Sequence, residues 1–196
     1  MTRNQFSKPI MLLLVSILIF TGEIKAQSLR INPKTSTMTI FGTTNVHDFK
    51  TKVEQMKGEL VMNSSKKVQS LNIEVPVRSI KSGEKLMDKK TYEAFNDGKY
   101  PTISFQLVDV ASLQVTGDDI NVIVNGNLTM AGVTKKISFK TTGKISKPGV
   151  YEFKGSIALK MTDFKMKPPT AMLGVMKVGD AITLKYDINL EGAPIN

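Results

Sequence analysis

The pair His47-Asp48 is the first place in this chain where residue types suggest chemistry, because a histidine beside a carboxylate can act as a general base. Neighbouring residues of a β-strand point to opposite faces, however, so these two side chains are not expected to form a proton relay. The chain also lacks a Gly-x-Ser-x-Gly nucleophile motif. We therefore predict no catalytic residues and no enzyme activity. For His47 we expect a structural or ligand-orienting hydrogen bond.

Metal binding is a second chemistry, and the composition restricts it. The chain has one histidine and no cysteine, so other metal ligands would have to be carboxylates or thioethers. Four of the 11 methionines lie in the segment from Met161 to Met176, and thioethers suit Cu(I). Their spacings of 5, 6 and 4 residues do not resemble a compact chelating motif. We therefore predict no metal site.

Phosphate and nucleic-acid binding are disfavoured by the same kind of argument. Gly126 and Gly132 flank Leu128-Thr129, but the Lys-Ser/Thr ending of a phosphate-binding loop is absent. The lysines are scattered, and no nucleic-acid-binding module is recognisable. We predict no cofactor and no nucleic-acid partner.

Residues 1–26 have the pattern of a secretory signal peptide. Two basic residues precede an apolar run from Ile10 to Phe20, which is too short to span a bilayer but has the length of a signal-peptide core. The small residue Ala26 suits cleavage. We predict a signal peptide over residues 1–26, a single mature domain over 27–196 and a periplasmic or secreted location. An uncleaved membrane anchor is the alternative.

The mature domain would carry a net positive charge and no disulfides. Removal of Arg3, Lys8, Glu23 and Lys25 lowers the formal charge from +10 by 2, to +8. A basic exported protein could contact an anionic membrane surface or a phosphorylated head group, or simply have a solvated basic surface. With no cysteine in the chain, stability must come from the core.

Alternation of apolar and polar residues dominates the mature domain. Such a period of two indicates half-buried antiparallel strands. The clearest runs are Leu71–Val77, Ile103–Leu107, Ile120–Val124, Ile137–Phe139 and Ile182–Leu190. Turn sequences separate them, and several strands at this spacing predict an all-β barrel or sandwich.

One helix is expected between these strands. Ser82 can serve as its N-cap, and Glu84 is favourable in the first turn. Asn96-Asp97-Gly98 would end it. Further along, Pro168-Pro169 makes the Met161–Met176 segment irregular, because proline suits neither a helix interior nor a central strand.

Four short motifs follow one another along the mature domain: His47-Asp48-Phe49, Gly98-Lys99-Tyr100-Pro101, Gly126-Asn127-Leu128-Thr129 and Gly132-Val133-Thr134-Lys135. Their order resembles that of the YceI-like family of lipid- and polyisoprenoid-binding proteins, over nearly all of the chain after residue 26. The resemblance implies an all-β fold with one short helix, in which the strands form an antiparallel, roughly eight-stranded, lipocalin-like barrel.

The resemblance also implies that inward-facing aromatic and aliphatic side chains line an elongated lumen. The candidates are Phe41, Phe49, Ile73, Val75, Phe105, Val122, Leu128, Phe139 and Phe153, with His47 as an orienting residue. Phe164 is a further cavity candidate. Methionine adapts to variable apolar partners, so we expect the Met161–Met176 segment, with Met166, Met172, Leu173 and Met176, to form a gate at the mouth. The alternative is that these methionines fill a gap in the core.

The function implied by the resemblance is that of an exported carrier or sink for a polyisoprenoid, an isoprenoid quinone or a fatty-acyl molecule. The expected partners are this apolar ligand and, transiently, an anionic membrane surface; no oligomeric state is predicted. A filled barrel shows the same alternation as one with a cavity. The alternative function is therefore a structural or stress-related interaction module without a ligand.

Overall fold

The computed structural model describes residues 27–63, 65 and 67–193. The signal peptide predicted over residues 1–26 lies outside these described residues. In the part of the chain that is described, no helix is both long and apolar enough to cross a membrane.

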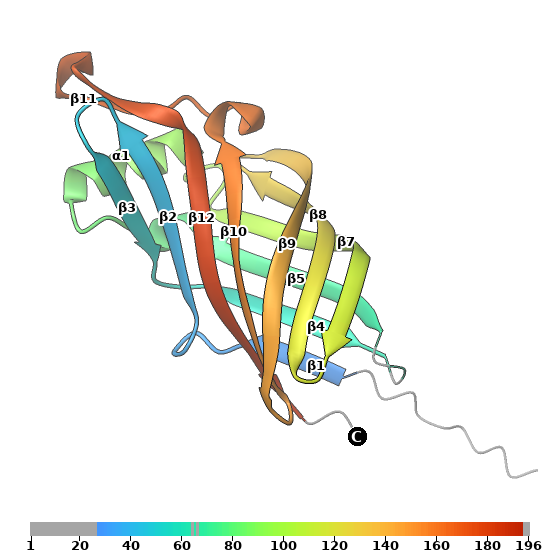
Figure 1. Cartoon of the computed structure of the whole chain (residues 1–196). Helices are drawn as coiled ribbons and strands as arrows, with labels where there is room; N and C mark the ends of the chain where they lie inside the picture. Colours follow the sequence, from blue (N-terminus) through green and yellow to red (C-terminus); the bar gives the residue numbers. More distant parts are fainter. Residues whose placement is uncertain (1–26, 64, 66, 194–196) are drawn as a thin grey trace, which may run out of the picture.

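Antiparallel strands make up most of the fold, with one α-helix among them (Figure 1). The helix, α1, is Lys85–Phe95, and short 3-10 helices are η1 (Val77–Ser79), η2 (Met161–Phe164) and η3 (Met172–Gly174). The strands are β1 (Gln27–Ile31), β2 (Thr37–Thr44), β3 (Asp48–Val53), β4 (Lys57–Met62), β5 (Val68–Pro76), β6 (Ile80–Lys81), β7 (Thr102–Thr116), β8 (Asp119–Met130), β9 (Val133–Lys147), β10 (Val150–Lys160), β11 (Thr170–Ala171) and β12 (Met176–Gly192).

Eight of these strands form a closed antiparallel barrel, which confirms the predicted fold class. Their order around the barrel is β1-β4-β5-β7-β8-β9-β10-β12. The ring closes because β12 also pairs with β1, from Leu29↔Gly192 to Ile31↔Leu190. Eight strands give an interior that is either filled by side chains or able to hold one small ligand.

One end of the barrel is extended by β2, β3 and β6. Strand β2 pairs with the first half of β12, from Val178↔Thr44 to Asp187↔Thr37, and β3 joins β2 to β6. Helix α1 packs against η1 and β6 at this same end, near the top of Figure 1. The β7–β8 turn lies at the opposite end.

Buried side chains fill the end that carries α1 and η2. They come from the helix, from the end of β8 and from the irregular segment around η2, and none is more than 6% exposed: Phe95, Met130, Met161, Phe164 and Met166. These residues belong to the same apolar cluster as the barrel core. The lumen is therefore closed at this end by packed side chains.

The helix begins later than its predicted N-cap. Its N-cap is Glu84, which makes no side-chain capping hydrogen bond. The backbone N–H of Ser82 instead donates to Asp88 Oδ1 (2.7 Å), and the Ser82 hydroxyl donates to the same oxygen (2.6 Å). The prediction of Ser82 as the N-cap was therefore wrong, because Gly83 has a positive φ of 89° and the helix starts only after Glu84. The Ser82 hydroxyl accepts a hydrogen bond from the Glu84 N–H (3.0 Å), outside the helix. The predicted end is confirmed, since Asn96 adopts a left-handed conformation (φ 51°) as the C-cap.

Candidate ligand cavity inside the barrel

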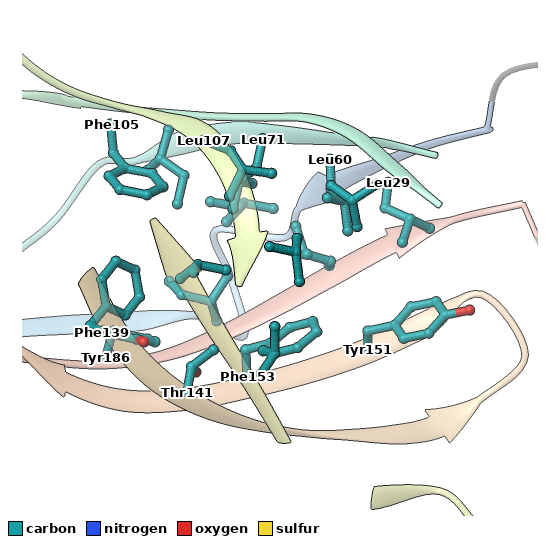
Figure 2. Close-up of a pocket in the computed structure, with 18 of the residues that line it drawn as sticks. Leu29, Leu60, Leu71, Phe105, Leu107, Phe139, Thr141, Tyr151, Phe153 and Tyr186 are labelled. Carbon is teal, nitrogen blue, oxygen red and sulfur yellow. The ribbon is translucent and has the colours of Figure 1, made fainter. Parts of the chain in front are cut away.

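The barrel encloses a cavity of about 380 Å³ (Figure 2). All eight strands of the ring contribute to its wall. The lining side chains are aliphatic or aromatic, except for Thr141 and the hydroxyl groups of Tyr151 and Tyr186. Pockets for drug-sized ligands fall in the range of roughly 300–1,000 Å³ and are predominantly apolar. The interior thus has both the size and the character of a site for an apolar molecule.

Aromatic rings cross one side of the lumen as a connected row. The ring centroids of Phe105 and Phe139 are 5.6 Å apart at an interplanar angle of 62°, and those of Phe139 and Tyr186 are 6.3 Å apart at 78°. Edge-to-face contacts of this kind stabilise aromatic pairs beyond their burial. The three rings come from β7, β9 and β12, so the row connects separate parts of the wall.

Glycines on neighbouring strands leave room for these rings. A Cβ atom at Gly126 would overlap the ring of Phe105, and one at Gly155 would overlap the hydroxyl of Tyr186. A Cβ at Gly143 would lie only 2.6 Å from the ring of its cross-strand neighbour Phe153. Because glycine has no side chain, each ring can lie flat against the wall instead of filling the lumen.

The polar groups in the lumen are few, and one of them is unusual. The Thr141 hydroxyl donates to the backbone carbonyl of Lys154 (2.9 Å). The Tyr186 hydroxyl is buried and has no hydrogen-bond partner among the described residues. Burial raises the pKa of Tyr186; the nearby Thr141 side chain opposes this shift, although no hydrogen bond of ordinary geometry joins the two hydroxyls. Burial alone raises the pKa of Tyr151.

This wall excludes charge from the interior. None of the lining residues is an acid, a lysine, an arginine or a histidine. An ion placed in such a site would lose its hydration without gaining a partner, which is strongly unfavourable. A ligand can therefore place only an uncharged part in the lumen, and any charged head group must lie elsewhere.

The structure brings seven of the predicted cavity residues together on the lumen wall: Ile73, Val75, Phe105, Val122, Leu128, Phe139 and Phe153. Phe41 lies on neither cavity wall. Its neighbours Met38 and Ile40 line the lumen and a second cavity, respectively, while the Lys185 ammonium lies 5.1 Å from the Phe41 ring. The ring therefore covers the outer surface of β2.

The remaining predicted residues lie at the α1 end. A second cavity of about 490 Å³ is lined by His47, Phe49, Met166 and Met176. Phe164, which is 2% exposed, is one of the buried side chains that close the lumen at this end. Met172 belongs to η3, and its side chain lies outside the described part of the structure. Whether any of these residues binds or gates a ligand stays a prediction.

The second cavity differs in chemistry from the lumen. It lies between α1, the β2–β3 turn and the segment after η2, and its wall includes His47, Asp48, Lys50, Glu84 and Lys90. The hydrogen bonds of His47 that hold this turn are made by its backbone. The His47 N–H donates to the Thr44 hydroxyl (3.0 Å), and the Thr44 hydroxyl donates to the His47 carbonyl (2.7 Å). Across the described residues, no three His, Cys, Asp or Glu side chains are placed to hold a metal ion.

Several lumen residues were not predicted from the sequence. The alternation over Ile182–Leu190 indicated a strand, and its members Leu184, Tyr186, Ile188 and Leu190 all line the cavity. The same signal in Leu71–Val77 could have identified Leu71. Leu29 and Ile31 offered little signal, because β1 is only five residues long.

Comparisons with known proteins agree with this geometry. A sequence model of the YceI-like domain matches residues 29–190. Three solved structures resemble the fold. BcnA of Burkholderia cenocepacia has 18% identity and a TM-score of 0.65, with 81% of this chain and 98% of that chain covered. A polyisoprenoid binding domain from Saccharophagus degradans, implicated in plant cell wall breakdown, has 14% identity and a TM-score of 0.69, with 87% and 99% covered.

The third is the Campylobacter jejuni YCEI protein, with 18% identity and a TM-score of 0.55, covering 72% of this chain and 83% of that chain. At these identities the structural likeness concerns the fold. No curated protein sequence matches this chain.

Proposed function

Because the chain belongs to the YceI-like family, we propose that it is an exported binding protein that holds a long apolar ligand inside its barrel, as a carrier or a sink. The observation that carries the proposal is the apolar cavity of about 380 Å³. The candidate ligands are a polyisoprenoid, an isoprenoid quinone and a fatty-acyl molecule. The description of the Saccharophagus degradans domain as polyisoprenoid binding supports the first of these.

The energetics of such a site favour a chain over a compact polar molecule. Each CH₂ group moved from water into an apolar site contributes about 0.8 kcal/mol, so ten buried groups would contribute about 8 kcal/mol. A gross contribution of this size corresponds to roughly micromolar affinity before the cost of ordering the chain is counted. Affinity would thus come from chain length, and a lumen without charged groups suits binding better than catalysis.

Organic extraction of the protein purified from its own cells, followed by mass spectrometry, tests the proposal. We expect an apolar chain molecule in the extract at close to one per protein. A matched pair of variants locates it: Val122→Trp places an indole in the cavity, whereas Ile123→Trp places one on the outer face of the same strand, where Ile123 is 38% exposed.

The first variant should lose the extracted molecule and the second should keep it. A folded wild-type protein that yields no apolar molecule would instead favour the module without a ligand. Export is tested separately, by N-terminal sequencing of the native protein, which should begin at Gln27. An intact Met1 in the membrane fraction would contradict cleavage.

A further inference from the structure

The barrel wall is incomplete between β5 and β7. Their ladder runs from Pro76↔Thr102 to Asn72↔Gln106 and ends there. Strand β5 extends further, to Val68, and β7 extends to Thr116. Among the described residues, the β7 segment after Gln106 pairs only with β8. One side of this segment therefore has no neighbouring strand.

Irregularities in β7 explain why the two strands separate. Two register shifts interrupt its pairing with β8, between Leu107 and Asp109 and between Val110 and Ser112. Such β-bulges bend and twist the strand that contains them. Strand β5 stays paired with β4 as far as Val68, so it does not follow β7. A gap opens between them toward the end of the barrel opposite α1 (Figure 1).

The lumen reaches this gap. Val68 and Leu71 line the cavity from the β5 side, and Leu107, Val110, Leu113 and Val115 line it from the β7 side. Figure 2 shows Leu71 and Leu107 among the side chains that line the pocket. Both rims of the gap are therefore apolar and continuous with the cavity wall.

Exposure shows that the cavity is open here. Leu113 and Val115 line the cavity and yet are 55% and 54% exposed. On the intact wall of β8, the lining residues Val122 and Val124 are only 7% exposed. The opposite end of the lumen is closed by the buried side chains around Phe164. The gap between β5 and β7 is therefore an apolar path from the surface into the lumen.

We propose that the gap bounded by Val68–Leu71 and Leu107–Val115 is the portal through which a linear apolar chain enters and leaves the lumen. This portal rests on the proposed function, and it is the route by which the ligand would reach the cavity. A lateral opening lets a chain slide in sideways, with its apolar part passing between apolar rims. Exposed, unpaired strand edges are normally avoided because they promote aggregation, so a ten-residue unpaired edge calls for a function.

A cross-link across the gap tests the proposal. Ser70 and Val108 lie on the two rims of the gap, just beyond the last pair Asn72↔Gln106. Neither residue lines the lumen, and the chain has no native cysteine, so Ser70→Cys with Val108→Cys introduces the only two thiols. A bis-methanethiosulfonate reagent bridges such a pair through two disulfides, which reduction cleaves. The control pair, Asn121→Cys with Thr142→Cys, joins directly paired residues of the complete β8–β9 ladder. Neither control residue lines the lumen.

The probe is parinaric acid, a linear polyene whose fluorescence rises in an apolar site, mixed with delipidated protein. Release is then followed by adding phosphatidylcholine vesicles. We expect cross-linking of the Ser70/Val108 pair to slow both uptake and release by about tenfold or more, equivalent to at least about 1.4 kcal/mol of added barrier. Reduction should restore both rates, and the control pair should show no change.

Two results would overturn the portal while leaving the proposed function intact. One is uptake at the same rate in the cross-linked and reduced forms of the Ser70/Val108 variant. The other is equal slowing in the Asn121/Thr142 control, which would indicate a general effect of stiffening. Failure of the wild-type protein to take up the probe, together with an empty organic extract, would instead overturn the proposed function and the portal with it.

Discussion

The unpaired hydroxyl of Tyr186 leads to a prediction about stability. Replacement by phenylalanine removes this one atom and keeps the ring that packs against Phe139. A buried polar group without a partner carries a desolvation penalty of about 1–3 kcal/mol, which the unfolded state avoids by hydrogen bonding to water. Tyr186→Phe should relieve that penalty, so the variant should be more stable than the wild-type protein.

The net gain is smaller than the full penalty. The hydroxyl packs over Gly155, and its removal forfeits a few atom contacts of about 0.1–0.2 kcal/mol each. We therefore expect the free energy of unfolding to rise by about 1 kcal/mol. For a domain of this size, 1 kcal/mol corresponds to an increase in Tm of roughly 2–4 °C.

Urea denaturation of the delipidated protein, with thermal unfolding as a second measurement, tests this value. Tyr151→Phe is the matched control, because its hydroxyl is not a buried group without a partner. That variant should gain no stability. A loss of about 1 kcal/mol in Tyr186→Phe would refute the reasoning, since it would mean that the hydroxyl makes a net favourable hydrogen bond. The Thr141 side chain would be its partner, and Thr141→Val would then lower stability without adding to the loss in the double variant.

Three further predictions concern the lumen wall and the closed end of the barrel. Burial raises the pKa of Tyr186 above its ordinary value of 10.0, so the unfolded state loses this proton first and the free energy of unfolding should fall as pH rises above 10. Denaturation measured between pH 9 and 11 should show a smaller fall in the free energy of unfolding for Tyr186→Phe. Gly126→Ala should lower the free energy of unfolding by about 1–3 kcal/mol, because the new Cβ would overlap the ring of Phe105. The control Gly98→Ala should have little effect in the same denaturation assay, because no atom lies within 4 Å of its Cβ position. Met166→Lys should prevent folding or lower the free energy of unfolding by roughly 3 kcal/mol or more, because the side chain is 5% exposed; a folded variant of normal Tm would show that this end of the barrel is not packed as described.

Alternation predicted the strands well because a period of two follows directly from strand geometry. It placed Ile73, Val75 and Val122 on strands whose inward face is now evident. It could not decide which face of β2 points inward, since Phe41 lies among several apolar neighbours. That choice is set by pairing with β12, which lies more than 130 residues further along the chain.

The parts that were missed depend on interactions that no local pattern records. The bulges in β7 interrupt a run in which Leu107, Val108 and Val110 are all apolar, so periodicity gave no warning of them. The Ser82 side chain had a suitable position for capping, but the positive φ of Gly83 takes the chain out of the helix before Ser82 is reached. The closed end of the lumen required α1 and η2 to meet, and each contributes side chains that only the tertiary fold brings together.

The pairing of β1 with β12 has a consequence for how this protein folds. The ring closes through Leu29↔Gly192, two residues separated by 163 positions, so the barrel cannot be completed until the last strand has been synthesised. Contacts this distant in sequence slow folding, and all-β topologies of high contact order fold in milliseconds to seconds. During that interval the inward faces of the strands stay accessible, and an apolar chain present at that moment could be enclosed as the ring closes. Refolding in the presence and absence of parinaric acid would then differ in rate as well as in final stability.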